Sequence, residues 1–530
     1  MKGMNYLAIA MLSVIHATVG AVSTAANGLE VLNDQELSAE TGQALFNLAY
    51  TAPNDSANLM TGKTIAGASV GNVGFYKLGM EAEIELNANI RKLQLGCGGR
   101  NGANACDIEI NNLGLSGLPD GGTHNQFGVA QAGGGYDANG SPVYSESKPR
   151  PATSAKLVNP FIQFAIKNPD SASTRQVLGF RTSAEEIYGM LSAGTDNLDY
   201  ANGDGIQSLS GFMRLAGASG TVDTKETLFG NTGDQILGAY ESSGPYSDPE
   251  QKPNMIVSLL GTHKRIIKNN PGTPDNHGIS VPAIKGIAFN TPAFQVNGVR
   301  NTLAEVKGIK LKINSIPLGK VADVNGNYTS VGAKNQLYVT YDPILGLASD
   351  AKFQVADGSD VRNLHLDITF QQSLSMFHNI PLNGNGGYLA LQAQKILWPG
   401  AYIDSSDSGK TEINNMTRSD VAQPGWWMSL EDEVQLGKLK ATDPVDISSS
   451  LPQVAKLSSK YLQDNPVLVS GSEGLQALVG NPIAKLLNID LETYTNPLVE
   501  GGTPARVTLA NLKLANQNLV PNCYGTLKFC

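Results

Sequence analysis

The sequence predicts a mostly β protein: long bulged antiparallel strands forming an extended sheet or sandwich, with a few short helices and long Gly/Asn-rich loops. Three observations support this fold class. Apolar and polar residues alternate strictly in one long segment, the same break in alternation recurs along the chain, and helical spacing is scarce. Hydrophobic residues make up 41% and charged residues 16% of the 530 positions, which excludes a polyelectrolyte and a bundle of membrane helices.

The first 26 residues have the organisation of a cleavable secretory signal peptide. A single Lys2 precedes an apolar run from Tyr6 to Val22, and small residues follow between Ala21 and Ala26. The alternative is an uncleaved anchor, although no charge cluster follows the run. We expect export through the inner membrane to the cell surface or extracellular space, with the periplasm as another possible location, and no integral span in the mature chain.

Residues 27–116 are expected to hold an N-terminal motif followed by long β-strands. The motif spans residues 32–45, and within it residues 34–45 could hold one short helix that ends at Gly42. From Met80 to Ile90 every even position is apolar and every odd position is Glu or Asn. Such alternation predicts a strand of about 36 Å with one buried face and one wet face.

The alternation slips at Arg91-Lys92, and the same step of three residues recurs elsewhere. An amphipathic helix would also produce steps of three, but Asn-Asn, Lys-Gly and Ala-Asn pairs near several slips favour β-bulges or sharp strand bends. The slips separate Ile110 from Leu113, Ile313 from Ile316, Leu436 from Leu439 and Leu509 from Leu512.

Residues 117–280 are expected to be loop-rich insertions that carry one short helix. The helix is predicted from a capping box at Ser183–Glu186, which precedes Ile187, Met190 and Leu191. Residues 281–530 are predicted to be a β-rich region with two short helices near 452–487, the second interrupted at Asn481-Pro482. A disulfide is expected to pin the C-terminus.

Four cysteines are present: Cys97, Cys106, Cys523 and Cys530. Export favours an oxidised state, and four cysteines allow three pairings. The short spacings favour two local bridges, Cys97–Cys106 and Cys523–Cys530, each contributing roughly 2.5 kcal/mol. A zinc site is the competing interpretation, but the spacing lacks the C-x2-C of zinc-binding motifs.

Sequence motifs for chemistry are weak. Gly67–Gly71 fits G-x-S-x-G with Ser69 as a nucleophile, and Ala57–Thr64 fits a loose phosphate-binding loop. Asp199–Gly205 and Asp323–Asn327 could be calcium loops, but such Asn-Gly and Asp-Gly segments are equally hairpin turns. Three tryptophans, Trp398, Trp426 and Trp427, could stack on sugars, although packing in the core is the favoured interpretation.

A net charge of -9 without a basic stripe disfavours a nucleic-acid partner. We expect no catalytic residues, no cofactor and no metal site. On one strand Glu81, Glu83 and Glu85 share a face, and on another Lys310 and Lys312 do. These faces either pair with each other or are solvated separately.

Several segments resemble one family. Residues 32–45 look like the L-x-D-x-x-L-S-x-x-T/S-G-Q opening of exported gammaproteobacterial surface proteins. Residues 74–99, residues 106–110, the block Phe377-His-Asn-Ile-Pro-Leu-Asn383 and the terminal Cys523 together resemble the Fil-type (FilA-like) proteins, which are named for surface filaments or fimbria-like fibres.

This resemblance implies a secreted structural or accessory component of a cell-surface filament, in adhesion or fibre assembly, and brings no catalytic residues with it. The expected partners are other filament subunits or a second copy of the chain. Two alternatives from other classes are a secreted hydrolase using Ser69 and an outer-membrane or periplasmic β protein that binds lipid.

Overall fold

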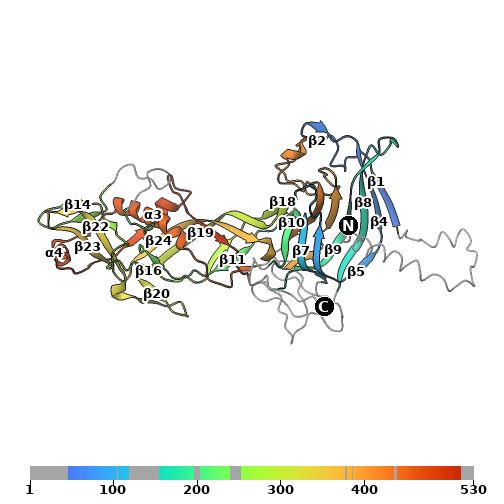
Figure 1. Cartoon of the computed structure of the whole chain (residues 1–530). Helices are drawn as coiled ribbons and strands as arrows, with labels where there is room; N and C mark the ends of the chain where they lie inside the picture. Colours follow the sequence, from blue (N-terminus) through green and yellow to red (C-terminus); the bar gives the residue numbers. More distant parts are fainter. Residues whose placement is uncertain are drawn as a thin grey trace, which may run out of the picture.

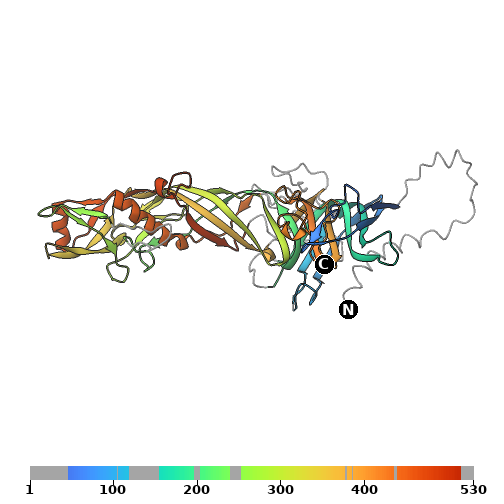
Figure 2. The ribbon, with the colours of Figure 1, turned by 90° about the horizontal axis from the view of Figure 1, so that it is seen from above.

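The computed structural model describes residues 46–103, 105–117, 154–195, 203–238, 252–376, 379–384, 386–434 and 438–514. The fold is mostly β, as predicted, with sheets of up to twelve strands. The molecule is elongated, and long strands join two lobes (Figures 1 and 2). We call the lobe that contains the twelve-stranded sheet the sheet lobe, and the lobe that contains helices α3, α4 and α5 the helical lobe.

The sheet lobe is built around one path of nine strands to which three more strands attach. The order along the path is β1-β4-β8-β9-β26-β27-β10-β7-β6, while β5 pairs with β8, β18 with β10 and β25 with β9. The strands of this sheet are β1 (Phe46–Thr51), β4 (Val73–Met80), β5 (Glu83–Leu86), β6 (Ala88–Leu95), β7 (Ile108–Ser116), β8 (Ala155–Lys167), β9 (Gln176–Ala193), β10 (Ile206–Leu215), β18 (Phe294–Asn301), β25 (Asn379–Asn383), β26 (Gly387–Gln392) and β27 (Gly425–Val434).

One face of this sheet is covered by two irregular segments of the chain. Residues 52–72, which include the hairpin β2 (Thr64–Ile65) and β3 (Ala68–Ser69), and residues 393–424, which include η3 (Ile413–Asn415), lie against it. Their apolar side chains form one core with strand residues such as Phe75, Phe212 and Trp427. We call this the covered face.

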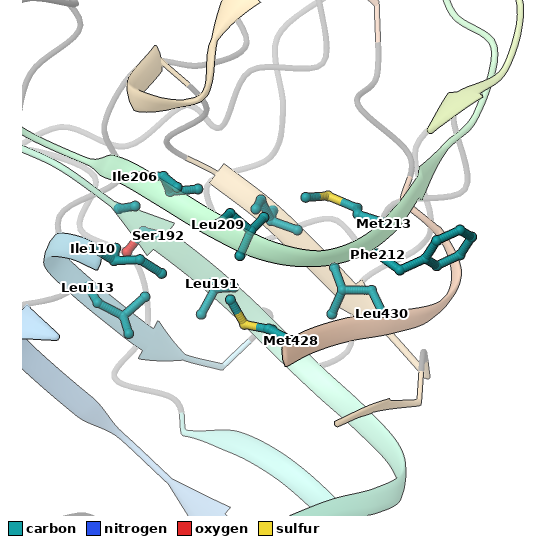
Figure 3. A pocket seen from close by; sticks show the side chains of 12 residues that line it. Ile110, Leu113, Leu191, Ser192, Ile206, Leu209, Phe212, Met213, Met428 and Leu430 are labelled. Atoms are coloured by element: carbon teal, nitrogen blue, oxygen red, sulfur yellow. The ribbon is translucent and has the colours of Figure 1, made fainter. Parts of the chain in front are cut away.

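The predicted bends at Ile110–Leu113, Ile313–Ile316 and Leu509–Leu512 coincide with asparagines in left-handed backbone conformation, while the slip at Leu436–Leu439 falls partly outside the described residues. In β7, Asn112 has φ 51°, and the strand changes partner there: Ile108 and Ile110 pair with β10, whereas Leu113 to Ser116 pair with β9. Asn tolerates this conformation better than most residues because its short polar side chain bonds locally. The bend closes β9, β26, β27, β10 and β7 into a ring around a small apolar space (Figure 3).

Residues Met80 to Ile90 do not form the single continuous strand that the alternation predicted. Met80 ends β4, residues 83–86 form β5 beside β8, and β6 then pairs with β7. The alternation is real, but the chain moves to a new partner strand at each interruption. Its predicted buried face is at most half-buried, and Leu86 is exposed.

The helix predicted from the capping box at Ser183–Glu186 is also wrong. These residues lie in the middle of β9, the longest strand, and pair with β8. The Ser183 hydroxyl donates to the Gly387 carbonyl of β26 instead of capping a helix. The region 117–280 therefore contributes the long strands β8, β9 and β10 to the sheet lobe, and the Gly-rich part of it at 118–153 lies outside the described residues.

The helical lobe packs several small sheets against helix α3 (Leu451–Asp464). Helix α4 (Gly471–Leu478) begins at a capping box of Ser470 and Glu473 and ends before Asn481-Pro482, and α5 (Glu492–Thr495) is a single turn. The two predicted helices near 452–487 are therefore present. The strands of this lobe are β12 (Thr227–Phe229), β13 (Met255–Val257), β14 (His263–Arg265), β15 (Lys268–Asn269), β16 (Ile279–Val281), β20 (Lys320–Ala322), β21 (Tyr328–Ser330), β22 (Gln336–Ile344), β23 (Ala348–Val355), β29 (Val467–Val469), β30 (Ile483–Lys485) and β31 (Asn488–Asp490).

Long strands connect the two lobes. In β19 (Leu303–Pro317), buried Ile309, Leu311, Ile313 and Ile316 follow the predicted slip, and Asn363 of the partner strand β24 (Asp360–Ser373) has φ 55° at the same place. Strand β32 (Ala505–Ala510) extends this sheet and bends at Asn511, the last predicted Ala-Asn slip. The strands β11 (Ser219–Val222), β17 (Ile287–Asn290) and β28 (Leu439–Lys440) complete the connection.

The chain passes repeatedly between the lobes, so neither lobe is one continuous segment. It leaves the sheet lobe after β10, returns for β18, leaves along β19, returns after β24 for β25, and leaves again after β27 (Figure 1). The region 281–530 consequently supplies strands to both lobes.

Candidate interaction surface

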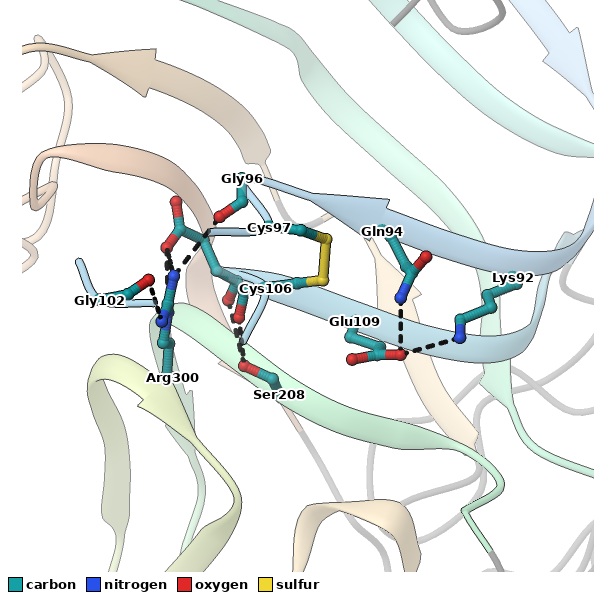
Figure 4. Close-up of a disulfide and its surroundings, with 10 residues drawn as sticks. Lys92, Gln94, Gly96, Cys97, Gly102, Cys106, Glu109, Ser208 and Arg300 are labelled. Carbon is teal, nitrogen blue, oxygen red and sulfur yellow. Dashed lines mark hydrogen bonds and ion pairs between the residues drawn. A yellow bond between two sulfur atoms is a disulfide. The ribbon is translucent and has the colours of Figure 1, made fainter. Parts of the chain in front are cut away.

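The disulfide Cys97–Cys106 is present as predicted and closes a loop between β6 and β7 (Figure 4). The carboxylate of the adjacent Asp107 is buried, accepts from Nε of Arg300 at 3.2 Å and accepts from the backbone N–H of Trp426 at 3.0 Å. These contacts attach the loop to β18 and β27 of the same sheet. Cys523 and Cys530 lie outside the described residues, so their pairing stays a prediction.

Ser69 lies in the two-residue strand β3, in a short hairpin and not in a strand-to-helix turn. Its hydroxyl accepts from the N–H of Gly71 at 3.2 Å. The hairpin turn is bound by Glu412, which accepts from the N–H groups of Ala66 and Gly67, both at 2.9 Å. These bonds, that from Gly67 first, lower the pKa of Glu412 to about 2.

A hydrolase that used Ser69 would need a histidine base beside it. Of the described histidines that follow Ser69 in the chain, His263 lies in β14 and His277 beside β16, both in the helical lobe, and His365 lies in the connecting strand β24, whereas β3 is in the sheet lobe. The loose phosphate-loop motif ends in strand β2, and Lys63 donates to the Lys410 carbonyl. Neither motif therefore has the local structure that its chemistry needs.

The Asp323–Asn327 segment is the turn of the β20–β21 hairpin. The Asp323 carboxylate accepts from the N–H groups of Asn325 and Asn327, both at 2.8 Å, which is an ordinary turn arrangement. In the second candidate loop, Asp204 bonds to Thr195 and Asn112 and stabilises the start of β10, while residues 199–202 lie outside the described residues. Among the residues that the structure describes, no group of three or more His, Cys, Asp or Glu could hold a metal ion.

Two of the tryptophans are core residues, as the favoured interpretation predicted. Trp398 and Trp427 are fully buried on the covered face, and Trp426 is partly buried. Trp427 donates to Asp420, whose carboxylate also accepts from Tyr388 at 2.7 Å and Ser429 at 2.6 Å. Burial raises the pKa of Asp420, although these donors act in the opposite direction.

The pairing of the Glu face with the Lys face, one of the two alternatives left open by the sequence, does not occur among the described residues of one molecule. Lys310 of β19 pairs with Asp367 of β24 at 2.8 Å, and Lys312 of β19 pairs with Glu492 of α5 at 2.9 Å, while Glu83 pairs with Lys156 in the sheet lobe. The alternative of separately solvated faces fits better, since these three side chains keep 40–57% of their surface exposed beside their ion-pair partners. The pairs are partly exposed and contribute little stability.

The least expected feature is the second face of the twelve-stranded sheet, which carries uncharged side chains across six strands. Residues directly opposite each other in an antiparallel ladder share a face. The first row across the sheet is Tyr50, Tyr76, Phe164, Phe180, Leu391 and Trp426. The second row is Leu48, Leu78, Ile162, Thr182, Leu389 and Met428. Phe46 and Met80 begin a third row. We call this set of residues the open face.

Exposure of the open face rises from β27 toward β1. Trp426, Leu389 and Met428 pack against the core inside the ring of strands. Farther along the sheet, Phe164 is 41% exposed, Leu78 47% and Leu48 75%. The open face is thus a core-type surface that continues past the ring without a described element to cover it.

The aromatic rings of the open face contact one another but do not form a flat platform. The centroids of Tyr50 and Tyr76 are 4.5 Å apart with 30° between planes, and Phe180 meets Trp426 edge-on at 84°. Stacking on sugar rings would need exposed rings lying flat in one plane. The geometry instead fits packing against apolar side chains.

An apolar cavity in the helical lobe bears on the lipid-binding alternative. It lies between α3 and the sheets and is lined by residues such as Phe229, Leu337, Phe353, Val454 and Leu462. Its volume is about 50 Å³, whereas a cavity that admits benzene measures about 150 Å³. The space does not fit an acyl chain without rearrangement of the core.

No protein-family model, no curated protein and no solved structure matches the chain. Within the described ranges, no helix is both long and apolar enough to cross a membrane.

Proposed function

We propose that the protein is an exported structural or accessory component of a cell-surface filament or fimbria-like fibre, in adhesion or fibre assembly. The observation that carries the proposal is the open face, an uncharged surface of aromatic, aliphatic and methionine side chains. Soluble monomers rarely expose contiguous apolar patches of more than a few hundred Å². The family resemblance, which rests on segments near both ends and in the middle of the chain, points to the same role.

The chemistry of the open face favours a protein partner over a lipid surface. Cores of protein interfaces are depleted in charge and enriched in Tyr, Trp, Phe and Met, which matches the residues of both rows. Surface helices and sheets that bind anionic membranes carry Lys or Arg around their apolar side. The two rows contain no such residue, and the chain has a net charge of -9.

The elongated, interleaved β fold fits a structural role. The disulfide loop is bound to two further strands through Asp107, which is consistent with a protein built to persist outside the cell. We propose no catalytic activity. Ser69 occupies a hairpin whose hydrogen bonds serve the turn.

Immunogold electron microscopy of intact cells tests the proposal, with antibody raised against the purified protein. We expect gold along surface fibres in cells with the unchanged protein. Leu78→Lys, which places a charge in the middle of the open face, should reduce fibre labelling by about tenfold because it opposes apolar packing. Leu475→Lys, at a 58% exposed position of α4 in the helical lobe, is the matched control and should label normally.

Both variants must be exported and melt at the same temperature as the unchanged protein for the comparison to apply. Labelling confined to the periplasm, or fibres that form normally with Leu78→Lys, would contradict the proposed function.

A further inference from the structure

Strand β1 forms one end of the twelve-stranded sheet and has an unusual sequence for an edge. Its residues, Phe46-Asn-Leu-Ala-Tyr-Thr51, include no charge, no proline and no glycine. Natural edge strands avoid pairing with other chains through charges, prolines, bulges or a covering segment. Strand β1 has none of the sequence features that protect an edge.

Several other edge strands carry such protection, and the neutral edge strands β17 and β29 are only four and three residues long. Strand β6, at the opposite end of the same path, has Arg91 and Lys92 at its centre. In the helical lobe, edge strand β14 is His263-Lys-Arg265, and β15 begins with Lys268. Only β1, among the edges of the larger sheets in the described ranges, consists of six neutral residues.

The outer side of β1 carries backbone hydrogen-bonding groups that no described strand uses. All six residues pair with β4 on the inner side, in continuous register from Phe46 opposite Met80 to Thr51 opposite Phe75. In an antiparallel ladder every second residue directs its N–H and C=O to the other side. No strand that the structure describes pairs with that side of β1.

We propose that β1 pairs antiparallel with β1 of a second copy of this chain, about a two-fold axis that passes through Leu48. A two-fold axis perpendicular to the sheet keeps the two open faces on the same side, and opposite residues then share that face. Leu48 lies opposite Leu48, and Phe46 lies opposite Tyr50 in both directions. The pairing joins the two twelve-stranded sheets into one.

The strand is complementary to itself in both shape and charge. Each cross-strand pair on the open face joins two apolar side chains, and Phe46 beside Tyr50 is an aromatic pair of the kind that stabilises strand pairing. Each molecule carries a net charge of -9, so most edge contacts between copies would bring like charges together. The neutral edge avoids that repulsion.

The pairing also explains why side chains of the open face are most exposed on β1. Leu48 and Phe46 are among its most exposed residues, at 75% and 49%, and both lie on the edge strand. In the pair they acquire neighbours from the second copy, and the aromatic row of one molecule continues from Tyr50 into Phe46 of the other. The inference rests on the proposed function, since it names the partner of the first assembly step.

Site-specific cross-linking of the purified mature protein tests the register. Leu48→Cys should give a disulfide-linked dimer under mild oxidation, because Cβ atoms of opposite residues lie about 4.5–5.5 Å apart. Phe46→Cys mixed with Tyr50→Cys should cross-link more than either variant alone. The control for random collision is Val324→Cys, at a 97% exposed position in the β20–β21 turn, and it should give about tenfold less dimer.

Sedimentation measures the pairing without a cross-link. The unchanged protein should be a dimer at micromolar concentration. Leu48→Lys should be a monomer at low salt, because two lysines then face each other, while Val324→Lys should remain a dimer. Leu78→Lys should also remain a dimer, since Leu78 lies one strand inside the edge, even where its fibres are lost.

The two proposals therefore fail separately. An unchanged protein that is monomeric, or a Leu48→Cys variant that cross-links no more than Val324→Cys, overturns the β1 pairing whatever the microscopy shows. Cross-linking through Leu78→Cys in place of Leu48→Cys also overturns it, because the copies would then meet face to face. A dimer in cells that lack surface fibres supports the pairing and refutes the filament.

Discussion

Replacing Asp420 with alanine should destabilise the sheet lobe severely. The carboxylate is 1% exposed and accepts from three donors on the covered face: Tyr388 of β26 and Trp427 and Ser429 of β27. Asp420 belongs to the irregular segment at 393–424, so its bonds hold that segment against the sheet. Loss of the carboxylate leaves three buried donors without an acceptor.

The expected loss of stability follows from the three hydrogen-bond donors that lose their acceptor. An unsatisfied buried donor costs about 1–3 kcal/mol, and partial relaxation of the loop would recover some of it. We therefore expect Asp420→Ala to lower the free energy of unfolding by about 3–5 kcal/mol. Tyr388→Phe removes one donor and leaves the carboxylate two others, so it should cost about 1 kcal/mol.

Urea unfolding followed by tryptophan fluorescence measures both effects, since Trp398 and Trp427 lie in this core. The double variant Asp420→Ala/Tyr388→Phe should cost less than the sum of the two single changes, because one orphaned donor is then absent. An Asp420→Ala loss below about 1 kcal/mol, or strict additivity, would refute the assignment of these bonds to a buried network.

Three further outcomes are expected. Non-reducing peptide mapping should find Cys97 joined to Cys106, and a Cys97–Cys523 peptide would contradict this bridge. The double variant Cys97→Ser/Cys106→Ser should lower the free energy of unfolding by roughly 2.5 kcal/mol in thermal melts. Asn363→Val should lower the free energy of unfolding by about 1–3 kcal/mol, because a β-branched residue resists the φ of 55° at this position. Asn363→Gly should lower it clearly less, and equal losses from the two changes would refute backbone strain as the cause. Hydrogen bonds from Lys312, then His365 and Asn496, lower the pKa of Glu492 to about 2. Its stabilising effect is therefore present above about pH 4.5 and is lost as the pH falls toward 2, and melts of Glu492→Gln should show a weaker pH dependence over that range.

The alternation of the sequence predicts strands well where one face is buried and the other is wet. Buried Ile309, Leu311 and Ile313 in β19 follow the pattern, and the Asn and Gly residues beside the slips mark the bends. The same reasoning fails at Ser183–Glu186, where a local capping signal is overridden by pairing with β8 and β26. Propensity is local, whereas these pairings join residues far apart in sequence.

The open face could not be read from the sequence for a related reason. In β8 the run Phe161-Ile-Gln-Phe-Ala-Ile166 has apolar residues on both faces and one polar residue, Gln163, a pattern typical of a strand buried on both sides. The covered face fits that expectation, with Ala165 fully buried, but Phe164 is 41% exposed. Nothing in single-sequence patterning distinguishes a face that the same chain covers from one that no described element covers.

The interleaving of the two lobes sets the order of events when the chain folds. Strand β10 pairs in parallel with β27, β13 with β29, β23 with β30 and β24 with β32. Each of these sheets therefore lacks a strand until residues 425–510 have been synthesised and have reached it. Closing such long loops is slow, and the unpaired strands stay exposed meanwhile. When this chain emerges from its N-terminus, from a ribosome or a secretion channel, neither lobe can complete its sheets early. Protection from aggregation must therefore last until nearly the whole chain has emerged.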